Sequence, residues 1–263
     1  MKFRPCIDIH AGVVKQIVGS TLSDDKDAAG PVTNFVSKLR SADYAAMYKR
    51  DGLTGGHIIM LGASEANEKA AVEALEAFPN GMQIGGGITT ANCRYYLDRG
   101  ASHVIVTSYV FRDGAIDMGR LHELRDAAGK DRLVLDLSCR KKDDGLYYIM
   151  TDRWQVFSHV TLSASLLSEL ADYCDEFLVH AVDVEGKRCG IQEDLVTNLA
   201  LWSPIPVTYA GGASTLDDMS LVERIGQGKV DLSIGSALDI FGGSLSYDAL
   251  VAYTQTPSST THA

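Results

Sequence analysis

The chain has 263 residues, 46% of them hydrophobic, and a formal net charge of −10. That composition supplies a large core and excludes disorder as the default state. The acidic balance argues against nucleic acid or an anionic membrane as a partner, although a local pocket can still bind phosphate groups. No apolar run approaches the ~20 residues that a membrane-spanning helix needs.

Short apolar runs alternate with helix-period segments along the whole chain. Strands are predicted at 3–9, 57–61, 82–85, 103–107, 132–137, 177–182, 205–209 and 231–235, and helices at 40–51, 65–77, 90–99, 115–128, 163–174, 191–202, 215–226 and 246–254. Strict alternation implies parallel strands joined by crossover helices. Eight such units predict an α/β fold, a (β/α)₈ TIM barrel in a single domain over 1–263. An open doubly wound sheet is the alternative.

Turn and capping residues support several of these helix boundaries. Thr90 is expected to cap the helix at 90–99, which Gly100 ends. Ser163 and Thr215 stand immediately before two other predicted helices and are suited to the same role.

Two polar segments are longer than a barrel scaffold requires. Residues 10–39 follow the first strand, with a small hairpin expected around 13–18, and residues 138–162 follow the fifth strand. Loops after barrel strands surround the active site, and long loops in a compact domain are usually functional or disordered. The polar tail at 256–263 is expected to be disordered.

The chain repeats several features at a nearly constant offset. Asp8 and Asp136 each close an apolar run and lie 128 residues apart, and the same offset separates Ser108 from Ser236. Two Gly-Gly pairs repeat at an offset of 125. These matches predict a two-fold half-barrel repeat, with halves at about 1–130 and 131–255, and a site with two carboxylates and two anion-binding turns.

The repeated glycine and serine turns are candidate phosphate sites. Glycine between a strand and a helix lets a ligand approach the backbone, and the helix N-terminus offers free N–H groups. For one such turn alone, a tight turn that merely needs glycine is an equal alternative. Two equivalent turns, each followed by a serine one unit later, favour a substrate with two phosphates. The predicted phosphate-binding residues are Gly86, Gly87, Thr107, Ser108, Gly211, Gly212, Gly235 and Ser236.

The two aspartates are candidate catalytic groups. Asp8 and Asp136 end the first and fifth strands, which lie opposite each other in an eight-stranded barrel. Opposed carboxylates suit a reaction that needs a general acid and a general base. The structural alternative pairs them with Lys15 or Arg140. A metal pair is not expected, because no histidine or further acid has suitable spacing nearby.

Further polar residues near the predicted barrel mouth have less specific signals. Asp183 and Glu185 follow the sixth strand and are either site acids or surface ion pairs. His57 and His180 are more typical of partly buried, hydrogen-bonded histidines than of catalytic ones. Trp154 either stacks on a flat heterocycle or holds its own loop in place.

The five cysteines are scattered without a Cys-x-x-Cys spacing. This pattern favours buried reduced thiols over disulfides or a zinc site. With no targeting pattern recognised before the first strand, a cytoplasmic location is expected.

Long runs of the chain resemble the phosphoribosylformimino-aminoimidazole-carboxamide ribotide isomerase family of histidine biosynthesis, and its eukaryotic type in particular. The resemblance covers nearly the entire chain. It rests on Cys6-Ile-Asp-Ile-His-Ala-Gly, Gln83-Ile-Gly-Gly-Gly-Ile, Val104-Ile-Val-Thr-Ser, Leu135-Asp-Leu-Ser-Cys-Arg-Lys, Arg153-Trp-Gln, Glu176-Phe-Leu-Val-His-Ala-Val-Asp-Val-Glu-Gly, Tyr209-Ala-Gly-Gly-Ala and Gly235-Ser-Ala-Leu-Asp-Ile-Phe-Gly-Gly.

The resemblance implies an Amadori rearrangement of an aminoaldose to an aminoketose, with no cofactor, no metal and no obligatory protein partner. Asp136 would be the acid that protonates the ribose ring oxygen, and Asp8 the base that removes the C2 proton. Further substrate contacts would come from Gly19, Ser20, Arg140, Trp154 and Asp183.

The chain departs from the bacterial pattern of this family at two positions. Thr89 stands where an arginine follows the first glycine turn, and Ala181 stands where a threonine ends the sixth strand. We expect Asp183 to take over that threonine's role, or the role to be absent.

Two other functions remain alternatives at this stage. The sister cyclase of the pathway, imidazole glycerol phosphate synthase, has the same paired acids and phosphate turns, but the Arg153-Trp-Gln loop resembles the isomerase more closely. A non-catalytic phosphosugar-binding barrel is the alternative of another class, and the two intact acids argue against it.

Overall fold

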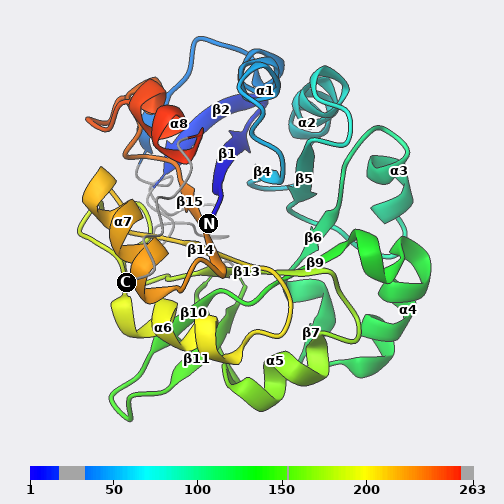
Figure 1. The fold of residues 1–263 in the computed structure, drawn as a ribbon. Coiled ribbons are helices and arrows are strands. Elements are labelled where there is room, and N and C mark those ends of the chain that lie inside the picture. The colour runs from blue at the N-terminus through cyan, green and yellow to red at the C-terminus, as the bar shows by residue number, and fades with distance from the viewer. Residues whose placement is uncertain (18–32, 153, 256–263) are drawn as a thin grey trace.

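A computed structural model describes residues 1–17, 33–152 and 154–255, and its central feature is a closed parallel barrel (Figure 1). The barrel strands are β1 (Phe3–His10), β4 (Gly56–Met60), β5 (Met82–Gly85), β6 (Val104–Val106), β9 (Leu133–Asp136), β13 (Glu176–His180), β14 (Val207–Ala210) and β15 (Val230–Ile234). They pair in this order, and β15 also pairs with β1. The predicted (β/α)₈ barrel is confirmed, and the open sheet is excluded.

The α-helices form the outer ring of the molecule (Figure 1). They are α1 (Ser41–Arg50), α2 (Glu65–Ala77), α3 (Cys93–Leu97), α4 (Met118–Ala128), α5 (Ala164–Leu170), α6 (Glu193–Trp202), α7 (Leu216–Ile225) and α8 (Tyr247–Gln255). Single 3₁₀ turns lie at Ser108–Val110, Lys130–Arg132 and Asp239–Phe241. Each helix follows a barrel strand, as the alternation in the sequence predicted.

Local capping explains where the predicted helix boundaries were right and where they were wrong. The hydroxyl oxygens of Ser163 and Thr215 accept hydrogen bonds from backbone N–H groups in the first turns of α5 and α7, as predicted. Thr90 is not a cap, because its hydroxyl pairs with Tyr109 and α3 begins only at Cys93. The predicted start of α4 was too early, because Asp117 caps that helix.

Two groups of extra strands extend the loops after β1 and β9. After β1, β2 (Val13–Ile17) folds back as the predicted hairpin and then pairs with β3 (Thr33–Val36). After β9, β10 (Cys139–Lys141), β11 (Tyr147–Thr151) and β12 (Val156–Thr161) form an antiparallel sheet. A small ribbon of β7 (Phe111–Arg112) and β8 (Ala115–Ile116) precedes α4. The predicted disordered tail at 256–263 lies outside the described residues.

The barrel interior contains two layers of side chains, an apolar layer in the middle and a charged layer near the N-terminal ends of the strands. Ile59, Ile105, Val134, Leu178 and Ala210 pack together across the barrel and fill its middle. Below this layer, the buried Arg4 guanidinium contacts Asp231 at 2.8 Å and Glu176 at 3.4 Å. Glu176 also accepts hydrogen bonds from Gln83 at 3.0 Å and Thr208 at 2.7 Å. The strands are therefore fixed from inside, which leaves their C-terminal ends available for the site.

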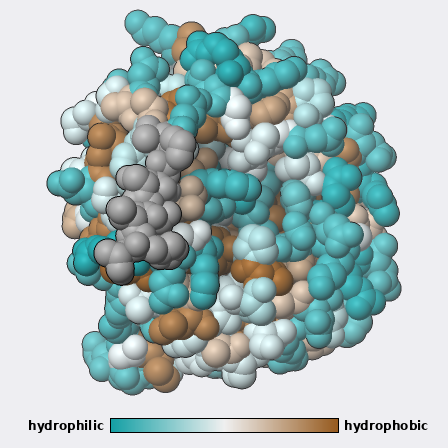
Figure 2. Space-filling model, in the orientation of Figure 1, coloured by the Kyte–Doolittle hydropathy of each residue, from teal (hydrophilic) through white to brown (hydrophobic). Residues whose placement is uncertain are grey.

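The outer surface is mostly hydrophilic in the view of Figure 2, with hydrophobic residues scattered over it. In the part of the chain that the structure describes, no helix is long and apolar enough to cross a membrane.

Candidate active site

A cavity of about 580 Å³ lies at the C-terminal ends of the barrel strands. Its lining includes both predicted catalytic acids, Asp8 and Asp136, and all eight predicted phosphate-binding residues, namely Gly86, Gly87, Thr107, Ser108, Gly211, Gly212, Gly235 and Ser236. These residues come from loops far apart in the sequence, and barrel closure brings them to one place. The predicted acids and anion-binding turns therefore face the same space.

The two glycine turns have the backbone shape that the sequence predicted. Gly86 has a φ of 95°, and a side chain there would meet the carbonyl oxygen of Met60 at 2.1 Å. Gly211 has a φ of 125°, and a side chain there would approach the carbonyl oxygen of Ala181 at 3.0 Å. Both conformations favour glycine, and at both positions the space that a side chain would need is filled by the protein itself. The phosphate assignment itself stays a prediction.

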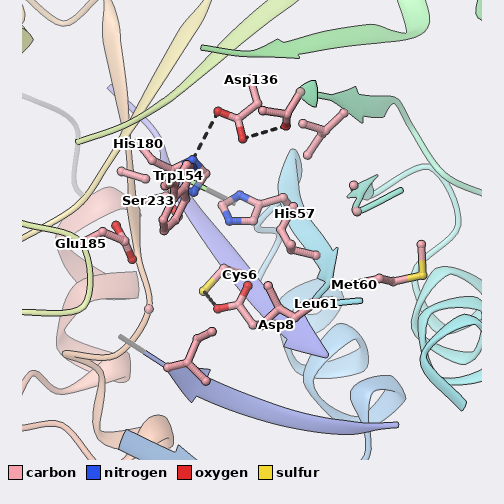
Figure 3. Close-up of a pocket in the computed structure, with 18 of the residues that line it drawn as sticks. Cys6, Asp8, His57, Met60, Leu61, Asp136, Trp154, His180, Glu185 and Ser233 are labelled. Atoms are coloured by element: carbon pink, nitrogen blue, oxygen red, sulfur yellow. Dashed lines mark hydrogen bonds and ion pairs between the residues drawn. The ribbon is translucent and has the colours of Figure 1, made fainter. Parts of the chain in front are cut away.

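Asp136 is held in a buried hydrogen-bond network at the end of β9 (Figure 3). Its Oδ1 accepts hydrogen bonds from the Ser138 hydroxyl at 2.5 Å and the Ser138 backbone N–H at 2.9 Å. The Thr107 hydroxyl donates to Oδ2 at 3.2 Å. His180 Nδ1 lies 3.5 Å from Oδ1 and 3.0 Å from the Ser138 hydroxyl oxygen.

The charges of Asp136 and His180 stabilise each other. Burial alone would raise the pKa of Asp136, but the His180 charge and the hydrogen bonds from His180 and Ser138 lower that pKa below its usual value. Burial likewise disfavours a charged His180, yet Asp136 outweighs it and raises the pKa of His180 to about 9. At neutral pH the pair is therefore a carboxylate and an imidazolium that together hold one proton.

Asp8 has a different environment at the end of β1. Its Oδ2 accepts a hydrogen bond from Gln16 Nε2 at 3.1 Å and a weak one from the Cys6 thiol at 3.9 Å. Burial raises the pKa of Asp8, and the charge of Glu185 raises it further, to about 7. No ion pair to Asp8 is formed among the described residues. Asp8 is therefore close to half ionised at neutral pH.

Glu185 is a third acid in the cavity wall (Figure 3). Its Oε2 would lie 3.2 Å from a side chain added at Gly211, so it sits beside the second glycine turn. Burial raises its pKa above the usual value, which favours the protonated form. The sequence marked Glu185 only as one of two acids after a strand, and the distinction from Asp183 required the structure.

Asp183 and Arg140 do not line the cavity. They form an ion pair with each other, in which Nε and Oδ1 are 2.9 Å apart. The inward position at the end of β13 is instead occupied by His180, two residues after the inward Leu178. Neither predicted structural partner pairs with Asp8 or Asp136, because Lys15 Nζ lies 3.1 Å from His10 Nδ1 and Arg140 pairs with Asp183.

The remaining predicted contacts divide between described and undescribed residues. Trp154 lines the cavity, and its ring centroid lies 5.2 Å from that of His180. Its ring can therefore contact a ligand that binds in the cavity next to His180. Gly19 and Ser20 lie outside the described residues.

Comparison with known proteins places the chain in a family. A family model described as "Histidine biosynthesis protein" matches residues 2–245. The chain belongs to this histidine biosynthesis family. Membership rests on nearly the whole barrel, including every strand described above.

Relatives within the histidine biosynthesis family share one printed activity, 1-(5-phosphoribosyl)-5-((5-phosphoribosylamino)methylideneamino) imidazole-4-carboxamide isomerase. A Medicago truncatula protein named as the chloroplastic form is 58% identical over 96% of this chain and 81% of its own length. A Neurospora crassa protein is 48% identical over 92% and 93% of the two chains. A Saccharomyces cerevisiae protein is 47% identical over 93% and 94%.

Proposed function

We propose that the chain catalyses the isomerisation named in its relatives, converting the ribosylamino end of a bisphosphorylated ribotide from an aminoaldose to an aminoketose. The carrying observation is the single cavity in which Asp8 and Asp136 face the same space between two pairs of anion-binding turns. Turns at both sides of the barrel mouth match a substrate with a phosphate at each end. The acids between them match a reaction that moves protons at its centre.

The reaction begins with two proton transfers, one at the ribose ring oxygen and one at C2, and both of these atoms are bonded to C1. Protonation of the ribose ring oxygen breaks its bond to C1 and leaves a Schiff base between C1 and the amine nitrogen. Removal of the C2 proton then returns electrons to that nitrogen and gives an enolamine. The enolamine becomes the ketone when the C2 hydroxyl loses its proton and C1 gains one. The ring oxygen and C2 are separated only by C1, so the acid and the base must border one cavity.

Asp8 is the proposed base for the C2 proton. A general base works best when its pKa lies near the working pH, because it is then ionised often enough and still binds a proton well. The environment of Asp8 raises its pKa to about 7, which meets this condition. Glu185 contributes to that value as the second cause of the shift.

The Asp136–His180 pair is the proposed source of the proton for the ring oxygen. Asp136 is ionised in the free protein, so the proton that it delivers is the one stabilised on His180, 3.5 Å away. Glu185 is a second candidate donor in the cavity, since burial raises its pKa above the usual value. Substitutions of Asp136 and Glu185 distinguish the two donors by which one abolishes turnover.

For the binding partner only a chemical class is proposed, and for the cellular location only an expectation from the sequence is given. A small bisphosphorylated molecule is the proposed partner, and neither nucleic acid nor a membrane is expected, given the net charge of −10. The cytoplasmic location stays a prediction, because one relative at 58% identity is named chloroplastic.

The test is isomerisation of the ribotide followed by absorbance, with the wild type, Asp8→Asn and Asp136→Asn. Each variant is expected to lose at least roughly 100-fold in kcat, on the scale of general acid–base catalysis. Asp183→Asn is the matched control, because this acid lies outside the cavity wall. Near wild-type turnover in either cavity variant would remove that residue from the mechanism. Formation of imidazole glycerol phosphate on adding a glutaminase subunit and its ammonia source would instead identify the cyclase.

A further inference from the structure

Three potential metal-ligand side chains meet at one edge of the cavity. Cys6 and Asp8 are two residues apart on β1 and share its inward face, and His57 lies on β4 directly opposite Cys6 in the strand register. One ligand atom from each of the three lies within 4.8 Å of the other two. In the view of Figure 3, the His57 ring lies between the Cys6–Asp8 contact and the Asp136–His180 pair.

The His57 ring lies in the cavity wall. It is 4% exposed and lines the cavity, and no hydrogen bond or ion pair joins it to another residue that the structure describes. Its nearest ring neighbour is His180, with centroids 6.0 Å apart. Burial lowers the pKa of His57 to about 3, so the imidazole is neutral and carries a free lone pair.

We propose that Cys6, Asp8 and His57 form a binding site for one zinc(II)-type ion, with the fourth coordination position open to the cavity. A thiolate, an imidazole and a carboxylate are the ligands that zinc prefers. Zinc–ligand bonds of about 2.0–2.3 Å put the atoms of a tetrahedron roughly 3.3–3.8 Å apart, so these side chains need to close by no more than about 1.5 Å. Magnesium and calcium prefer oxygen ligands and do not match this set.

Binding of the ion releases protons from the site. The Cys6 thiol and the Asp8 carboxyl group must be deprotonated to coordinate the metal, so affinity is expected to rise with pH.

An ion at this site is expected to inhibit the enzyme, since it occupies the carboxylate proposed as the base. This inhibition rests on the proposed function, whereas the binding site itself does not. Zinc should therefore compete with substrate, and inhibition should be reversed by a chelator. Inhibition at this site would depend on the concentration of free zinc and on Cys6 being reduced.

Metal binding is measured first, on the full chain kept reduced with a phosphine. Co²⁺ serves as the spectroscopic probe and Zn²⁺ competes against a chromophoric chelator. The wild type is expected to bind one equivalent, with a thiolate-to-cobalt charge-transfer band. Cys6→Ser should lose the band, and Cys6→Ser and His57→Gln should each bind at least about tenfold more weakly. Cys93→Ser and Cys189→Ser, which remove a buried and an exposed thiol elsewhere, should match the wild type.

The outcomes distinguish failure of the proposed zinc site from failure of the proposed isomerase mechanism. Absence of the charge-transfer band in the wild type, or equal zinc affinity in Cys6→Ser, His57→Gln and the wild type, overturns the site. Because either variant alone could be misfolded, thermal unfolding of each is measured alongside. Zinc bound with the predicted variant pattern but without any inhibition would uphold the site and count against Asp8 as the base. Inhibition that survives in both site variants would place the inhibitory ion elsewhere and overturn the proposed inhibition at this site.

Discussion

The two halves of the barrel carry an aspartate at equivalent strand ends, but they treat it in opposite ways. Asp136 shares its surroundings with a histidine that becomes a cation, and its pKa falls below the usual value. Asp8 has a glutamine, a thiol and a neighbouring acid instead, and its pKa rises to about 7. Scaffold symmetry places the two acids, and their different neighbours make one a stable anion and the other a base matched to neutral pH.

The largest expected effect of this difference is on the free energy of unfolding, which Asp136→Asn and Asp8→Asn should change in opposite directions. Asp136→Asn removes one partner of a buried ion pair and should lower the free energy of unfolding by about 3–5 kcal/mol near pH 7. The lowered pKa of Asp136 means that this stabilisation exists above the carboxyl group's unfolded pKa and is lost as pH falls. Urea unfolding at pH 7 measures the change.

Asp8→Asn should act in the other direction. The folded state raises the pKa of Asp8 from 3.8 to about 7, so ionised Asp8 destabilises the fold increasingly between those pH values. At pH 8 the variant should gain up to about 4 kcal/mol, and at pH 4 almost nothing. If both substitutions destabilise the protein equally at pH 8, the two environments do not differ as described.

His180→Gln tests the Asp136 half through catalysis. The substitution removes the proton that the pair holds, so kcat should fall roughly 100-fold, within the range of general acid catalysis. The wild type should show a bell-shaped pH profile of kcat/KM, rising near pH 7 and falling near pH 9, in line with the pKa values of Asp8 and His180. The variant should lose the fall near pH 9. His103→Gln, which removes the histidine paired with Asp175 outside the cavity, should keep the wild-type profile.

Glu185→Gln should produce the smallest change if the Asp136–His180 pair is the acid. Loss of the Glu185 charge removes one cause of the raised Asp8 pKa, so the rise in kcat/KM should move to lower pH. A loss of turnover by several hundredfold would instead assign the acid to Glu185. Asp183→Asn leaves the cavity charge in place and should shift nothing.

Most of the fold was predictable because the barrel is encoded by local patterns. Each predicted strand overlaps an observed one, since buried parallel strands read as short apolar runs. The errors occurred at the two ends of helices. The helix predicted at 163–174 ends at Leu170, and two helix starts were placed too early because side-chain contacts decide those boundaries. Thr90 bonds to Tyr109 instead of capping α3, and that partner is 19 residues away. The β7–β8 ribbon replaced the first residues expected in α4.

The site was predictable to the extent that it repeats. Asp8 and Asp136 were found through their equivalent contexts, and the glycine turns through their conformation. His180, Glu185 and His57 have no repeat partner, and their roles depend on distances across the barrel that no local pattern contains. The difference between Asp183 and Glu185 is similar, because two acids separated by one residue are distinguished only by which one the turn after β13 directs inward.

The charged layer at the base of the barrel bears on how the chain assembles. Arg4 belongs to the first strand, whereas its two carboxylate partners, Glu176 and Asp231, both belong to the second half. An isolated first half would leave a guanidinium group facing an apolar interior with no counter-ion, and an isolated second half would leave two acids together. Each half thus supplies the neutralising charge that the other lacks. The first strand is therefore expected to become stable only after the last strand has paired with it. Folding should then be cooperative over the whole barrel, and neither half should be stable alone.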